Sequence, residues 1–154
     1  MFSKQFGWLS LIALVLAGCS GGQPAAQAPA DTAAAAIPEL ASFSPADLKQ
    51  GKKLFAANCG RCHVGGQTYG TYGSTDVNLS FARLSESTPP RNTVDALIDY
   101  MKKPTSFDGK TDLIKTGEHA SYEGLGDDKL RLIAAHIIKE GKSNPGWGKG
   151  KNIR

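Results

Sequence analysis

Residues 58–66 read NCGRCHVGG, in which two cysteines are separated by two residues and a histidine directly follows the second. This C-x-x-C-H pattern is typical of haem c attachment. The thiols of Cys59 and Cys62 would add to the two vinyl groups of the porphyrin as thioethers, and His63 would be held under the ring, where it can bind iron. The stretch therefore predicts one covalently bound haem c, with His63 as the proximal iron ligand.

Two other uses of a cysteine pair compete with this interpretation. A structural zinc site takes four nitrogen or sulfur ligands, and the chain has no second cysteine pair, so His119 and His136 would have to complete it. A redox-active thiol pair is typical of a βαβ context, which the helical pattern described below does not provide. Both alternatives are weaker than haem.

The first residues have the pattern of an export signal. Residues 1–19 contain Lys4, an apolar run of about a dozen residues that is too short to span a bilayer comfortably, and a terminal Cys19. The ending LAGC before Ser20 resembles the lipobox of bacterial lipoproteins, which are cut just before a lipid-bearing cysteine. We predict a signal peptide over 1–18 and a lipid anchor on Cys19. An ordinary signal peptide is the alternative, and it would leave an unpaired exported thiol.

Composition divides the rest of the chain into a tether and one small domain. Residues 19–41 are rich in alanine and proline, with almost nothing to bury, which predicts a flexible tether that begins at the lipidated cysteine. Residues 42–154 are long enough for one domain with a modest core. The formal net charge of +4 is too small to argue for a nucleic-acid partner.

The apolar pattern of this domain is helical. Residues 44–59, 91–103 and 126–141 repeat apolar side chains at helical spacing, and 79–87 do so more weakly. Gly51 lies on the apolar stripe of the first segment, where glycine costs about 1 kcal/mol relative to alanine. This cost indicates that something crosses close to the backbone at this position. No strand-like alternation persists, so the predicted fold class is all-α.

The sixth position of the iron has three candidate ligands. Met101 lies on the apolar stripe of the helix predicted at 91–103, where methionine usually fills a core. His136 flanks the apolar stripe of the last helix, where a packing role is the plain interpretation. His119 lies in the irregular loop GEHASYEG. From spacing alone we favour His119 and leave the other two open.

Six segments in order resemble a known family over the domain from about Gly51 to Lys151. They are GKKLF (51–55), CGRCHVGG (59–66), TPPR (88–91), DYMKKPTSFDG (99–109), LRLIAAHI (130–137) and GWGKGK (146–151). This order is similar to that of the cytochrome c-550 family, the lumenal extrinsic haem subunit of photosystem II in cyanobacteria and some algae. The set is far more specific than C-x-x-C-H alone.

The resemblance implies a class I-like monohaem cytochrome c fold with two histidine ligands. It assigns the proximal position to His63 and the second to His119, because His119 stands between the DYMK helix and the last helix. The family's counterpart of Met101 does not bind iron. The counterpart of His136 belongs to the last helix, which crosses the first helix near a glycine such as Gly51.

The resemblance also implies a function that is not enzymatic. Two histidine ligands favour a low-potential haem, and in the family the protein stabilises the manganese–calcium cluster of photosystem II beside its core and other extrinsic subunits. We therefore expect such an accessory subunit on the lumenal side of the thylakoid membrane or the periplasmic face of the photosynthetic membrane. The alternative is a membrane-tethered electron carrier for another photosynthetic or respiratory partner. A haem enzyme such as a peroxidase is a third possibility, which would need an open iron position.

This chain differs from the family's usual pattern in three respects. The stretch from His119 to Leu130 is shorter, the charge is mildly basic rather than acidic, and the start of the chain indicates a lipid anchor. We therefore expect a divergent member or a paralogue.

Overall fold

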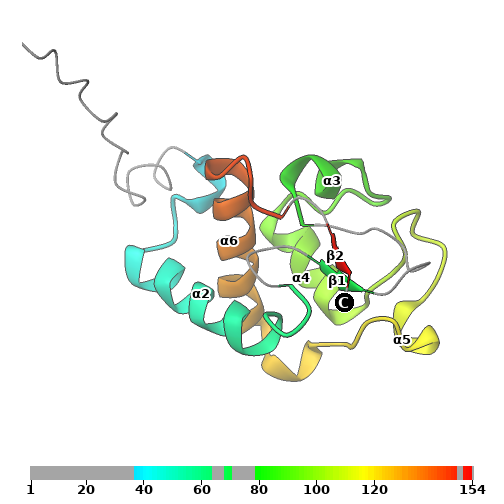
Figure 1. Cartoon of the computed structure of the whole chain (residues 1–154). Coiled ribbons are helices and arrows are strands. Elements are labelled where there is room, and N and C mark those ends of the chain that lie inside the picture. Colours follow the sequence, from blue (N-terminus) through cyan, green and yellow to red (C-terminus); the bar gives the residue numbers. More distant parts are fainter. Residues whose placement is uncertain (1–36, 64–67, 71–78, 149–150, 154) are drawn as a thin grey trace, which may run out of the picture.

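The computed structural model describes residues 37–63, 68–70, 79–148 and 151–153. This part of the chain is mainly helical, as predicted, and α6 lies between α2 and α4 (Figure 1). The elements in chain order are η1 (Pro38–Leu40), α2 (Pro45–Asn58), β1 (Thr68–Gly70), α3 (Phe81–Glu86), α4 (Val94–Lys102), α5 (Leu113–Thr116), η3 (Glu123–Leu125), α6 (Asp127–Ser143) and β2 (Lys151–Ile153).

Local signals explain where α2 begins and where α6 ends. The Ser44 N–H donates to Asp47 Oδ2 (2.9 Å) and the Asp47 N–H donates to Ser44 Oγ (3.2 Å), which satisfies two backbone donors at the start of α2. The predicted end of the last helix at Gly141 was wrong, because α6 continues to Ser143. It stops before Asn144, whose extended backbone is the conformation favoured in front of a proline.

The closest helix contact joins α2 to α6 at Gly51. A Cβ atom on Gly51 would overlap the carbonyl oxygen of Leu132 and lie 3.3 Å from Cβ of His136. The prediction that something crosses close to the backbone at Gly51 is therefore confirmed, and it is the backbone of the last helix, as the resemblance implied. The buried apolar side chains around this crossing form the core: Ile37, Leu40, Leu48, Phe55, Leu84, Val94, Leu97, Met101, Leu130, Ile133, Ala134, Ala135, Ile137, Ile138 and Trp147.

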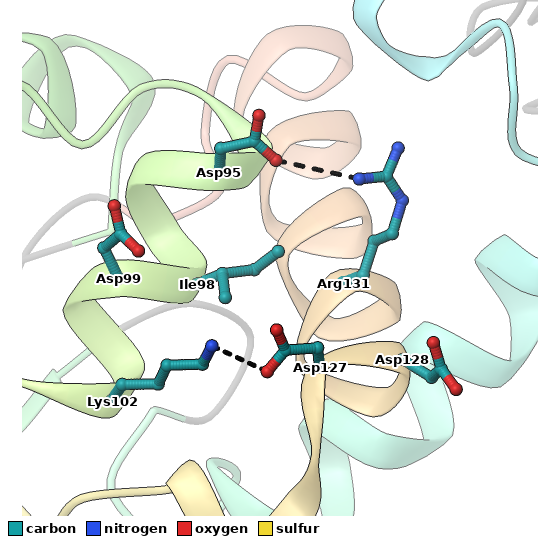
Figure 2. Close-up of a pocket in the computed structure, with 7 residues that line it drawn as sticks. All are labelled: Asp95, Ile98, Asp99, Lys102, Asp127, Asp128 and Arg131. Atoms are coloured by element: carbon teal, nitrogen blue, oxygen red, sulfur yellow. Dashed lines mark ion pairs between the residues drawn. The ribbon is translucent and has the colours of Figure 1, made fainter.

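Two ion pairs connect α4 with the first half of α6 (Figure 2). Lys102 Nζ lies 2.6 Å from Asp127 Oδ1, and Arg131 Nη1 lies 3.7 Å from Asp95 Oδ1. Because the aspartates are exposed, water screens both pairs, and each contributes little to stability. Between them lies a surface pocket of about 300 Å³, lined by Asp95, Ile98, Asp99, Lys102, Asp127, Asp128 and Arg131.

The short helix η1 connects the start of α4 with the end of α6. The Glu39 carboxylate accepts a hydrogen bond from the Val94 N–H at the start of α4, and it lies 3.7 Å from Lys142 Nζ near the end of α6. Ile37 and Leu40 beside it are buried. Residues 37–40 lie within the tether predicted over 19–41, yet these two apolar side chains are packed in the core of the described residues.

Two three-residue strands were not predicted. β1 and β2 pair in parallel, with Thr68 opposite Lys151 and Gly70 opposite Ile153. Segments this short do not carry a readable alternation of apolar and polar residues. In the described residues, no helix has both the length and the apolar character needed to cross a bilayer.

Replacing Gly51 with alanine is expected to destabilise the protein. The added Cβ would force α2 and α6 apart, and overpacking of this kind costs about 1–3 kcal/mol even though alanine favours the helix. The free energy of unfolding can be measured by urea titration of the purified full-length protein, followed by circular dichroism of the helices.

Gly141→Ala in α6 is the matched control. A Cβ there would make only an ordinary contact, 3.4 Å from Cβ of Phe81, so the free energy of unfolding should stay the same or rise by up to about 1 kcal/mol. Equal effects of the two substitutions would contradict the close crossing at Gly51.

Candidate haem site

The C-x-x-C-H stretch forms a tight turn at the end of α2. The N–H groups of Cys59 and Gly60 donate to the Phe55 carbonyl at 2.8 and 2.9 Å, and those of Cys62 and His63 donate to the Cys59 carbonyl at 3.0 and 2.8 Å. The turn therefore continues the helical hydrogen bonding past the last residue of α2. It brings two thiols and one imidazole together within five residues, as haem c attachment requires.

Gly60 is required by the closeness of this turn. A Cβ atom at this position would lie 2.5 Å from the carbonyl oxygen of Ala56. Any larger residue between the two cysteines at this point would therefore displace the turn from the end of α2.

The thiol environment argues against a redox-active cysteine pair. Burial, with a smaller contribution from Cys62, raises the pKa of the Cys59 thiol to about 11. Cysteines that exchange disulfides instead have lowered pKa values, because the thiolate is the nucleophile.

The ring of His119 lies near that of His63, although the two residues lie far apart in the sequence. Their ring centroids are 6.5 Å apart, with an angle of 43° between the ring planes. A metal–imidazole nitrogen bond of about 2.0–2.1 Å, with each centroid about 1.2 Å behind its nitrogen, places two imidazoles on opposite sides of one ion about 6.4 Å apart. The spacing of the two rings fits a single metal ion between them.

The loop that carries His119 is tied to the helices around it. The His119 N–H donates to the Leu113 carbonyl (3.1 Å) at the start of α5, and the Tyr122 N–H donates to the Met101 carbonyl (2.8 Å) near the end of α4. Tyr100 and Tyr122 meet the His119 ring edge-on, with centroids 5.4 and 5.9 Å away. The imidazole is thereby held between aromatic rings from two segments.

The second nitrogen of His119 has the partner that a metal ligand needs. Nδ1 lies 2.8 Å from the carbonyl oxygen of Ala120. A carbonyl only accepts, so Nδ1 carries the proton and the lone pair is on Nε2. Histidines that bind metals are commonly oriented by such a hydrogen bond from the other ring nitrogen.

Both imidazoles are held in the neutral form that binds metal. Burial, together with the neighbouring His119, lowers the pKa of His63 to about 4. Burial is also the main cause that lowers the pKa of His119; Arg91 adds to it, and the hydrogen bond to Ala120 acts against it. At neutral pH neither ring has to lose a proton before it binds iron.

The other two candidate ligands belong to the core. Met101 is buried among the apolar side chains on α4. His136 is buried on α6, with its ring 5.3 Å from that of Phe55 and 6.0 Å from that of Trp147, and burial lowers its pKa to about 4. Packing in the core accounts for both residues.

The zinc alternative also lacks support. It required His136 to join the cysteines, yet His136 lies within the contact between α2 and α6. Over the described residues, no group of three or more histidine, cysteine, aspartate or glutamate side chains is arranged to hold a metal ion. Cys19, the predicted lipid anchor, lies outside the described residues.

Sequence reasoning missed the residues that surround His119. Tyr122 also donates from its hydroxyl to the Asn58 carbonyl (3.1 Å) at the end of α2 and so connects the His119 loop to the cysteine turn. Tyr100 is the other aromatic neighbour of His119, and Arg91 lies over its ring, with Cζ 4.3 Å from the ring centroid. Arg91 and Tyr100 lie in the segments TPPR and DYMK, so the ordered motifs contained a signal for them.

Comparisons with known proteins show the family of the chain. A family model described as the cytochrome c-550 domain matches residues 24–154. The Gloeobacter violaceus protein named cytochrome c-550 2 is 64% identical over the full length of both chains. The protein named photosystem II extrinsic protein V of Synechococcus sp. (strain JA-2-3B'a(2-13)) is 38% identical, covering 99% of this chain and 94% of that one.

A solved structure extends the comparison to the fold. The crystal structure of the PsbV2 cytochrome from Thermosynechococcus elongatus matches with a TM-score of 0.59 at 36% identity, covering 68% of this chain and 76% of that one. The predicted all-α cytochrome c fold is confirmed, and covalently bound haem c is the cofactor. The chain belongs to the cytochrome c-550 family.

Proposed function

We propose that this chain is a low-potential cytochrome whose haem iron is held by His63 and His119 and whose thioethers form at Cys59 and Cys62. The observation that carries the proposal is the 6.5 Å spacing of the two imidazole rings, which come from segments on opposite sides of α4 in the sequence. The hydrogen bond from His119 Nδ1 to the Ala120 carbonyl supports it, because it directs the lone pair on Nε2 away from the backbone.

The ligand pair determines what the site can do. A bound haem c supplies a one-electron couple, and a methionine ligand raises its potential relative to histidine, so two histidines favour a low potential. The tyrosines around His119 hold the imidazole in place. With both axial positions taken by protein side chains, the site suits electron transfer or an accessory role rather than enzymatic catalysis.

Replacing His119 with alanine should open the sixth coordination position. We expect the ferric spectrum to change from six-coordinate low-spin to high-spin, and the variant to bind cyanide or imidazole that the parent protein excludes. Absorption and electron paramagnetic resonance spectra of the purified protein measure this.

Met101→Leu is the control, because it conserves side-chain volume and removes the only competing sulfur ligand in the mature chain. Its spectrum should match that of the unmodified protein. If Met101→Leu opened the iron and His119→Ala did not, the ligand assignment would be wrong.

As its biological role, we propose an extrinsic accessory subunit that binds the photosystem II core beside other extrinsic subunits and stabilises the manganese–calcium cluster. The match to photosystem II extrinsic protein V over 99% of this chain supports this role. The proposed place is the lumenal side of the thylakoid membrane or the periplasmic face of the photosynthetic membrane.

A membrane-tethered electron carrier is the second candidate. The chain is 64% identical to a protein named cytochrome c-550 2 and 38% identical to one named photosystem II extrinsic protein V, which favours a paralogue with a partner of its own. Lipid on Cys19, which we propose as the anchor, would supply two acyl chains or more and a stable attachment. Such an anchor raises the effective concentration near membrane partners without any new contact.

Affinity purification of the tagged full-length haem protein separates the two roles. From membranes dissolved in a detergent that keeps photosystem II intact, an accessory subunit should recover the core in near-stoichiometric amounts. The matched control replaces residues 1–19 with a secretory signal that adds no lipid; it should still recover the core, because binding would depend on the folded domain. Recovery of the haem protein without the core would favour the carrier.

A further inference from the structure

Arg91 is a buried cation beside the proposed haem site. Its residue is only 4% exposed, and Nη2 donates hydrogen bonds to the carbonyl oxygens of Thr105 (3.0 Å) and Ser106 (2.6 Å) and to Oγ1 of Thr105 (3.1 Å). All three acceptors are uncharged. In the part of the chain that the structure describes, no carboxylate lies within ion-pair distance of Arg91.

A buried charge without a counter-charge is costly. The guanidinium keeps its proton under all ordinary conditions, so the cost cannot be avoided by neutralisation. It has five N–H donors, yet its three hydrogen bonds to described residues all start from Nη2. The donors on Nε and Nη1 form an edge that suits a carboxylate with two oxygens.

Arg91 lies near His119, the proposed second iron ligand, because both side chains contact the ring of Tyr100. Its Cζ lies 4.3 Å from the centroid of the Tyr100 ring, and Tyr100 meets the His119 ring edge-on at 5.4 Å. A unit charge acting over about 10 Å at an effective dielectric constant of about 20 changes an equilibrium constant roughly tenfold. The guanidinium and the His119 ring contact the same tyrosine ring, so the charge lies beside the neighbour of the residue proposed to bind the metal.

We propose that Arg91 is the counter-charge of a haem carboxylate and an electrostatic positioning group that raises the reduction potential of the iron. Haem carries two propionate carboxylates, and these are the anions that enter this region together with the cofactor. A fixed positive charge stabilises the ferrous state, which has one positive charge fewer than the ferric state. Arg91 thus offsets part of the fall in potential that two histidine ligands cause. The inference rests on the proposed ligation by His119.

A purely structural role for Arg91 makes a different prediction. Its hydrogen bonds to Thr105 and Ser106 connect the segment before α4 with the segment after it. If these bonds were its whole purpose, its removal would lower the free energy of unfolding but leave the reduction potential of a correctly ligated haem unchanged.

The test is a redox titration of the full haem protein and three variants. Dithionite, with mediators, gives one electron to the ferric haem, and no proton transfer at residue 91 accompanies this step. In Arg91→Gln, which loses the charge, we expect the ferrous-to-ferric equilibrium constant to fall about tenfold, or 59 mV for one electron. Arg91→Lys keeps the charge and should stay within about threefold of the parent. Lys110→Gln removes an exposed charge and should change little.

Each result has a separate meaning. A parent protein without a six-coordinate, bis-imidazole ferric spectrum would overturn the proposed ligation and, with it, this inference. If that spectrum is present in all four proteins, an Arg91→Gln potential equal to that of the parent would overturn only the role of Arg91. If Arg91→Gln does not fold or retain haem, Arg91→Lys decides, because a tenfold fall with the charge retained would also contradict the proposal.

Discussion

The close contact of α2 and α6 at Gly51 is the constraint on which the rest of the site depends. The carbonyl of Leu132 takes the space that a side chain would need, so the two helices touch backbone to backbone. From this crossing, α2 runs to the turn that carries Cys59, Cys62 and His63. α6 lies between α2 and α4 and packs against both (Figure 1). The His119 loop is hydrogen-bonded to the end of α4, where the Tyr122 N–H donates to the Met101 carbonyl.

The loop that carries His119 and the short helix η1 contact opposite ends of α4. Met101, near the last residue of α4, accepts from the Tyr122 N–H in the His119 loop, whereas the N–H of Val94, its first residue, donates to Glu39 of η1. Among the described residues, η1 therefore lies away from the end of α4 that contacts the His119 loop.

Much of this arrangement could be predicted because its signals are local. The C-x-x-C-H turn needs only five consecutive residues, and the apolar stripes of α2, α4 and α6 repeat within single helices. The unfavourable glycine at position 51 pointed to a close crossing before any partner was known. Spacing favoured His119 as the second ligand but left Met101 and His136 open, and the resemblance then assigned that position to His119.

The remaining features depend on contacts that a sequence does not display. Tyr100 and Tyr122 acquire their roles only when α4 and the following loop meet around His119. From the sequence alone, Arg91 cannot be distinguished from an exposed charged residue, and only the structure shows that it is buried. The paired strands β1 and β2 lie far apart in the sequence, and each is too short to show a pattern of apolar and polar residues.

The central claim is that His63 and His119 bind one iron from opposite sides. It is tested most directly by electron–nuclear double resonance on the ferric protein, purified with its haem and with all histidines labelled with ¹⁵N. The account predicts couplings from two histidine nitrogens, one from each of two imidazoles. Coupling from a single imidazole, with the sixth position open or taken by a ligand that is not histidine, would contradict it.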